Sequence, residues 1–193
     1  MILTIVGDSM APGQEISATW LARRRALAGR NVLLLKQNCA KKHANQYTRE
    51  RDHADWLRTE MKAGASSSEL ASDLVEQELA SENNAFHDII IDIPKPFYVD
   101  AKTVLANSGL LIFHMELNLW NKERQANLLK CIRHARRSNA ELPVLIIVDN
   151  ITCMQSQSFV SKIAHSLANI RFIYLDVAGD LALVNLYRAV YLS

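Results

Sequence analysis

A short loop near the start of the chain has a composition that suits phosphate binding. The loop, Gly7 to Gly13, contains two glycines and a proline, so its backbone can turn sharply. It follows an apolar, β-branched run at 1–6 that predicts a buried strand, and it precedes a predicted helix at 14–28. The start of a helix offers unpaired N–H groups and a positive dipole end. A strand, a loop with glycines and a helix in this order therefore favour phosphate binding at the loop.

A carboxylate at the end of another apolar run is the second candidate for chemistry. The segment 86–92 predicts a buried strand that ends in Asp92, with Pro94 two residues later. Ligands of α/β proteins bind outside the carboxyl ends of the strands, where Asp92 is expected to lie. The residues alone equally allow Asp92 to cap the following segment or to hold a loop through hydrogen bonds.

The segments that must position these residues alternate between strand and helix. Apolar runs predict further strands at 31–35, 110–115, 144–148 and 170–175. Helices are predicted at 14–28, 69–80, 96–107, 119–138, 155–168 and 179–192, with a short one ending near Gly64. This alternation predicts a layered α/β/α domain with a sheet of about six mostly parallel strands.

The predicted helix at 14–28 carries the loop, so its packing matters most. Gly29 is well placed to end it. The residues predicted to be available for burial are Ile16, Trp20, Leu21 and Leu27.

Length and composition indicate one soluble domain. The 193 residues are 49% hydrophobic and 22% charged, a globular balance, and we expect a single domain over 1–193. No stretch of eighteen apolar residues and no leader-like N-terminus is present, which predicts a cytoplasmic protein without membrane insertion. The formal charge of +2 is too small to indicate nucleic-acid binding by itself.

The cysteines and histidines do not predict a metal site. Cys39, Cys131 and Cys153 are widely spaced, include no C-x-x-C pair, and are expected to be reduced thiols. His114 lies within an apolar run without a second histidine or a cysteine at ligand spacing, which is typical of a hydrogen-bonded core histidine.

Two stretches of the chain resemble the ParA/MinD family of deviant Walker ATPases, which includes the ParF-like partition proteins. In that family a strand runs into Lys-Gly-Gly-x-Gly-Lys-Thr-Thr, a helix follows, and the next strand ends in Asp-x-Asp. These motifs fall on residues 9–16 and 36–38. The segment 86–94 resembles the family's second motif, Tyr-Asp-x-Ile-Ile-Ile-Asp-x-Pro, and Asp92 falls on its aspartate. The resemblance implies a parallel-sheet fold of the P-loop NTPase type.

Compared with the family, the phosphate loop of this chain has less positive charge and one additional carboxylate. Only Gly13 matches; Ser9 and Gln14 replace the two lysines, and Glu15 replaces the hydroxyl that binds magnesium in the family. If each lost charge-assisted contact is worth roughly 1.5–3 kcal/mol, ATP binding weakens by about two to four powers of ten before repulsion by Glu15 is counted. We therefore predict a pseudo-ATPase with no catalytic residues.

The resemblance implies a set of binding sites and partners. A degenerate nucleotide site would comprise Gly13, Gln14, Glu15 and Asp92, and we expect no cofactor, with ATP and magnesium bound weakly at most. The expected function is that of a partition or positioning protein, which binds a partner protein of a partition, transfer or positioning system. Non-specific DNA and a nucleotide-independent homodimer are further expectations, because family members bind DNA through surface basic residues. The candidates for DNA contact are Arg23, Arg24, Arg133, Arg136 and Arg137, although these residues equally suit solvated helix faces.

Two alternatives stay open from the sequence. A lysine outside the motif, such as Lys36, Lys41 or Lys42, would make the chain a weak ATPase if it reached the phosphates. An α/β protein of another kind, with a different ligand at the carboxyl edge of its sheet, is the third hypothesis.

Overall fold

The computed structural model describes most of the predicted elements. The described residues are 1–7, 12–38, 55–62, 65–71, 79, 85–93, 101–116, 122–137, 139–149, 160–161, 163, 168–175 and 180–192. Within this part of the chain the strands are β1 (Ile2–Gly7), β2 (Val32–Asn38), β3 (Asp55–Lys62), β4 (Ala65–Ala71), β5 (Asp88–Ile93), β6 (Leu110–Glu116), β7 (Val144–Asp149) and β8 (Ile170–Leu175). The helices are α1 (Pro12–Leu27), α3 (Ala101–Asn107), α4 (Lys122–Ala135) and α6 (Asp180–Tyr191).

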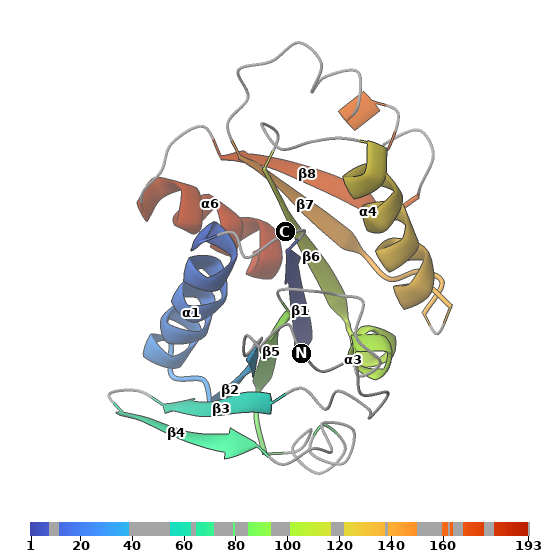
Figure 1. Cartoon of the computed structure of the whole chain (residues 1–193). Coiled ribbons are helices and arrows are strands. Elements are labelled where there is room, and N and C mark those ends of the chain that lie inside the picture. Colours follow the sequence, from blue (N-terminus) through green and yellow to red (C-terminus); the bar gives the residue numbers. More distant parts are fainter. Residues whose placement is uncertain are drawn as a thin grey trace, which may run out of the picture.

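The strands form one sheet in the order β4-β3-β2-β5-β1-β6-β7-β8 (Figure 1). The run from β2 to β8 is parallel throughout, whereas β3 and β4 are added antiparallel at one end. Parallel strands inside a sheet are buried on both faces, which explains why their sequences are rich in Ile, Leu and Val. The prediction of a layered α/β fold with a mostly parallel sheet is confirmed.

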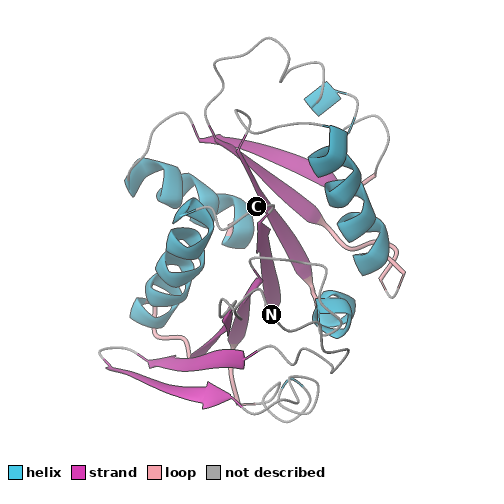
Figure 2. Cartoon of the chain, in the orientation of Figure 1, coloured by secondary structure: helices cyan, strands magenta, loops and turns pink. Residues whose placement is uncertain are grey.

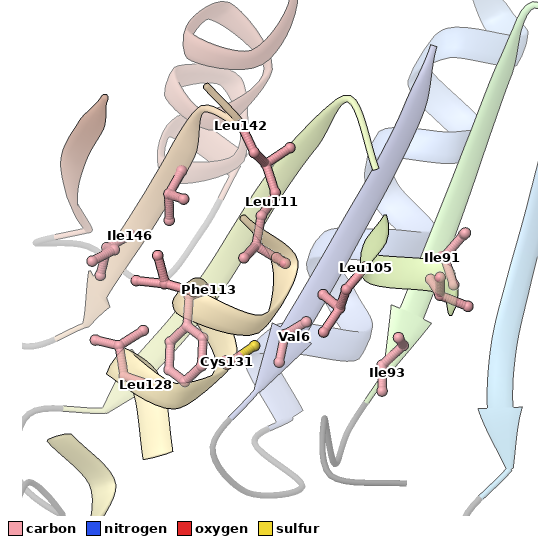
Figure 3. Close-up of a cluster of buried hydrophobic side chains, with 14 of the residues drawn as sticks. Val6, Ile91, Ile93, Leu105, Leu111, Phe113, Leu128, Cys131, Leu142 and Ile146 are labelled. Carbon is pink, nitrogen blue, oxygen red and sulfur yellow. The ribbon is translucent and has the colours of Figure 1, made fainter. Parts of the chain in front are cut away.

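Helices cover both faces of the sheet (Figure 2). Residues of α1 and α6 pack in one hydrophobic cluster with Leu3, Ile90 and Ile112 of the sheet. Residues of α3 and α4 pack on the opposite face, where Phe113 and Leu128 lie in the cluster drawn in Figure 3. Side chains alternate between the two faces along each strand, so a strand residue faces either α1 and α6 or α3 and α4.

Two predicted helices are wrong in the part that the structure describes. A short helix was expected to end near Gly64, and a second one to begin at Glu69, but β3 and β4 form a hairpin here. Met61 of β3 pairs with Val32 of β2, and β4 pairs with β3 along its length. Pairing with a distant strand satisfies the backbone hydrogen bonds, and such a contact overrides local preference. Most of the second predicted helix, 72–78 and 80, lies outside the described residues.

The buried face of α1 also differs from the prediction. Leu21 is buried and Trp20 is half-buried, as expected, but Ile16 is 56% and Leu27 is 70% exposed. The residues that α1 buries besides Leu21 are small, namely Ser17, Ala18, Ala22 and Ala26. Small side chains let the helix axis approach the sheet closely, so the contact face follows the alanines rather than the largest apolar groups. Gly29 ends the helix in the left-handed conformation, at φ 80°, as predicted.

Candidate ligand-binding edge of the sheet

The candidate site lies at the carboxyl edge of the parallel strands. β1, β2, β5 and β6 are parallel, so Gly7, Lys36, Asp92 and His114 all lie toward the same edge. Four residues separate Gly7 from Pro12, where α1 begins, and Figure 1 shows the start of α1 to the left of the end of β1, at a similar height. The first turn of α1 and the strand ends thus lie at one edge, as ligand binding in α/β proteins requires.

Three titratable residues at this edge share the face that α1 covers. Lys36, Asp92 and His114 each follow by two positions a residue of the cluster that contains α1. Because side chains alternate between faces along a strand, these three residues lie on the α1 side of the sheet. Asp92 is 5% exposed and His114 is 2% exposed, while Lys36 is partly exposed.

The strand register places these residues side by side. Lys36 of β2 is the register partner of Asp92 of β5, and Gly7 of β1 is the partner of His114 of β6. Register partners in neighbouring strands are about 4.8 Å apart and point to the same face. The register therefore places a lysine on the strand next to the carboxylate that the sequence singled out.

The described residues of this edge include few groups that could coordinate a divalent metal. Among the described residues, no three His, Cys, Asp or Glu side chains gather where they could hold a metal ion. Asp92 has two register neighbours: Ile5, which offers no ligand, and Lys36, whose ammonium donates hydrogen bonds and cannot coordinate a cation. The described residues of this edge therefore offer magnesium the Asp92 carboxylate, with a cation on the neighbouring strand.

Solved structures share this fold over nearly the whole chain, although no protein-family model and no curated protein sequence matches it. A plasmid partition protein from Borrelia burgdorferi is 14% identical, with a TM-score of 0.64 over 98% of this chain and 96% of that one. A cobyrinic acid a,c-diamide synthase from Mycobacterium smegmatis is 15% identical, with a TM-score of 0.62 over 98% and 94%. The pNOB8 ParA protein, solved with nonspecific DNA, is 11% identical, with a TM-score of 0.54 over 100% and 93%. The chain has a ParA-type fold.

The predicted nucleotide-site residues lie at the carboxyl edge of this sheet and in the first turn of α1. Asp92 lies at the end of β5, and Gly13, Gln14 and Glu15 belong to the first turn of α1, which begins two residues earlier than predicted, at Pro12. Proline suits this first helical position because its missing N–H has no partner there. The side chains of residues 12–15 lie outside the described part, as do Ser9, Lys41 and Lys42. The nearness of Lys36 to Asp92 is the feature of this edge that the sequence alone did not reveal.

A second charged cluster lies at the opposite, amino-terminal edge of the ParA-type sheet. Arg25 Nε donates to Asp88 Oδ2 at 2.8 Å, Arg30 Nε lies 3.7 Å from the same oxygen, and Asp88 is 2% exposed. The Arg25 guanidinium also stacks on the ring of Tyr191 at 4.1 Å. Burial works against the charge of Arg25, but hydrogen bonding to Asp88 and Tyr187 and attraction to Asp88 outweigh it and raise the pKa of Arg25. The cluster joins α1, β5 and α6.

The DNA candidates divide into exposed and structural arginines. Arg23 and Arg24 are exposed on α1, and Arg133 and Arg137 are exposed on or just after α4. The guanidinium of Arg136 instead donates to the carbonyl oxygen of Leu142 at 3.1 Å and to those of Ala168 and Asn169. α1 and α4 cover opposite faces of the sheet, so the two basic clusters do not form one surface (Figure 2).

None of the described helices is long and apolar enough to cross a membrane.

Proposed function

We propose that the chain is a partition or positioning protein of the cytoplasm that works by binding, with little or no ATP turnover. It uses a ParA-type fold to present binding surfaces to a partner protein and to DNA. The fold alone does not decide this, because one fold hosts many activities. The composition of the carboxyl edge carries the proposal.

The proposal of binding without turnover rests on the charged residues at this edge, which differ from those of the ParA/MinD phosphate loop. The first turn of α1 carries Gln14 and Glu15 in place of a lysine and a hydroxyl, and Lys36 stands beside Asp92. Phosphoryl transfer depends on positioning and on neutralising the phosphates with lysines and a metal. An added carboxylate at the helix start and a cation beside the acidic residue work against both requirements.

Restoring the lost groups tests this proposal. The paired substitution Gln14→Lys and Glu15→Thr returns a phosphate-binding cation and a metal-binding hydroxyl to the first turn of α1. We expect ATP affinity to rise by roughly tenfold or more, as for one regained charge-assisted contact. Unchanged affinity in a folded variant would mean that the loop no longer has the shape of a phosphate cradle.

A weak ATPase is the second candidate, and the position of Lys36 favours it. Lys36 lies at the carboxyl edge on the α1 side, where a nucleotide phosphate would lie in a P-loop arrangement. If Lys36 supplied the missing charge, Lys36→Met would abolish a measurable phosphate release, whereas Lys62→Met on the exposed end of β3 would not. Absence of phosphate release from the unaltered protein removes this candidate.

We propose DNA as one partner, bound through phosphate contacts. The exposed pairs Arg23 with Arg24 and Arg133 with Arg137 support this, and the pNOB8 ParA match was solved with nonspecific DNA. Contacts to phosphate carry no sequence information, so binding should be insensitive to base sequence and sensitive to salt.

A homodimer that forms without nucleotide completes the proposal, since Ser9 cannot reach across to a partner's phosphates as a lysine would.

A further inference from the structure

We propose that Lys36 takes the place of a divalent metal beside Asp92, so that ligand binding at the carboxyl edge is independent of magnesium. The inference follows from the juxtaposition of these residues on β2 and β5, and it deepens the proposed function, on which it rests. In this proposal Lys36 determines specificity, because its charge disfavours the binding of cations at the carboxyl edge of the sheet.

The geometry supports substitution of the metal by the ammonium group. Lys36 and Asp92 are register partners on neighbouring parallel strands and lie on the α1 face of the sheet. Asp92 is almost fully buried, and a charge in such a place interacts strongly with its neighbours because water screens it little. A lysine one strand away from a buried carboxylate adds a positive charge to its surroundings, which favours the ionised form of the carboxylate.

The chemistry of magnesium explains why the lysine and the ion exclude one another. Magnesium requires near-octahedral coordination by oxygen atoms and uses carboxylates, which Asp92 alone can offer among Lys36, Asp92 and His114. A cation approaching Asp92 would also meet the ammonium of Lys36, and the repulsion between like charges weakens its binding. Removing the lysine charge should therefore create metal affinity that the unaltered protein does not have.

Binding of Mn²⁺ to the full chain, measured from the loss of the free Mn²⁺ resonance signal, tests the proposal. The unaltered protein should bind no Mn²⁺ through Asp92 at millimolar concentrations. Lys36→Met, which keeps most of the side-chain length without its charge, should bind Mn²⁺ at least roughly tenfold more tightly. Lys36→Asp should bind more tightly still, and adding Asp92→Asn should abolish both gains. Lys62→Met, a lysine change at an exposed position of β3, serves as the matched control and should behave as the unaltered protein.

Either of two results overturns the proposal. One is stoichiometric Mn²⁺ binding by the unaltered protein that disappears in Asp92→Asn, a comparison that does not depend on the folding of a Lys36 variant. The other is a folded Lys36→Met protein that binds Mn²⁺ no better than the Lys62→Met control. A phosphate-release assay with ATP, run once with magnesium and once with a chelator, distinguishes a failure of this proposal about Lys36 from a failure of the proposed function. Metal binding through Asp92 without turnover contradicts only the role of Lys36, whereas turnover in the chelator contradicts only the proposed function.

Discussion

Arg25 Nε of α1 donates a hydrogen bond to Asp88 Oδ2 at the start of β5, with 2.8 Å between the two atoms. Asp88 is buried, and the ring of Tyr191 on α6 covers the other side of the guanidinium. This contact fixes α1 at the amino-terminal edge of the sheet, while the start of the same helix lies at the carboxyl edge. The orientation of α1 at the candidate site therefore depends partly on a residue at the opposite end of the helix.

Arg25→Ala should lower the free energy of unfolding by about 2–3 kcal/mol. The substitution removes the hydrogen-bonded cation and leaves the buried Asp88 carboxylate with two more distant ones, Arg30 Nε at 3.7 Å and the N-terminal ammonium of Met1 at 3.8 Å. A buried carboxylate that loses its closest charged partner is costly. Arg24→Ala, an exposed neighbour, should change the free energy of unfolding by less than about 0.5 kcal/mol. Urea unfolding followed by circular dichroism measures both variants. Equal stabilities would mean that the ion pair contributes nothing to the position of α1.

The Cys131 thiol should resist alkylation in the folded protein. Burial raises the pKa of Cys131 to about 12, so the reactive thiolate is nearly absent at neutral pH, and the side chain is also shielded from reagent. Mass spectrometry after iodoacetamide treatment should show Cys131 unlabelled in the native protein and labelled in urea. Rapid labelling of native Cys131 at pH 7 would contradict its burial in the core cluster.

The same raised pKa makes a prediction about stability against pH. The folded protein holds the thiol proton more tightly than the unfolded chain, in which cysteine has a pKa of about 8.5. This contribution to stability is therefore complete below the unfolded pKa and is lost as the pH rises toward about 12. Unfolding midpoints measured from pH 7 to 10.5 should fall more steeply for the unaltered protein than for Cys131→Ala, which has no thiol to titrate.

DNA binding should depend separately on the two exposed arginine pairs. Replacing Arg23 and Arg24 by alanine, or Arg133 and Arg137, should each reduce the slope of log affinity against log salt by about 1–2, because each pair contacts up to two phosphates. Arg136→Ala should lower stability rather than this slope, since its guanidinium holds backbone carbonyl groups. Fluorescence anisotropy with a random duplex measures the slopes. No binding even at low salt would remove DNA as a partner.

Self-association should not respond to nucleotide. In the proposed correspondence with the ParA/MinD phosphate loop, Ser9 stands where the family has the lysine that bridges to the phosphates of a second copy. Serine is too short for this contact, so we expect any dimer to rest on direct protein contacts. Sedimentation velocity with and without ATP and magnesium should give the same distribution of species. A monomer that becomes a dimer only when ATP is added would contradict this account.

The sequence predicted the central sheet well because each parallel strand contains a short, mostly apolar run that can be recognised without information from elsewhere in the chain. β5 and β7 are examples, and both are buried along their described length. The hairpin of β3 and β4 was missed for the opposite reason. Its serine-rich second strand has no local strand signal, and it is extended because it pairs with β3, which in turn pairs with β2.

The candidate site was predictable in its parts but not in its arrangement. Asp92 and the helix start could be recognised from motif spacing, whereas the neighbourhood of Lys36 and Asp92 depends on the pairing of β2 with β5. The order of strands in a sheet is decided by the packing of the whole domain, and it brings together residues that are far apart in the sequence. For the same reason Arg25, grouped in the sequence with Arg23 and Arg24, turned out to be an ion-pair partner of Asp88.

Calorimetric titration of the unaltered protein with ATP and magnesium, alongside a phosphate-release assay, tests the central claim most directly. Under the proposed correspondence of Ser9, Gln14 and Glu15 with the two lysines and the hydroxyl of the ParA/MinD phosphate loop, we expect a dissociation constant weakened by about two to four powers of ten relative to a functional phosphate loop, with no steady turnover. The heat of binding should be the same when magnesium is replaced by a chelator, because Lys36 already stands beside Asp92. A low-micromolar, magnesium-dependent dissociation constant together with steady phosphate release would contradict the account and identify the chain as an active ATPase.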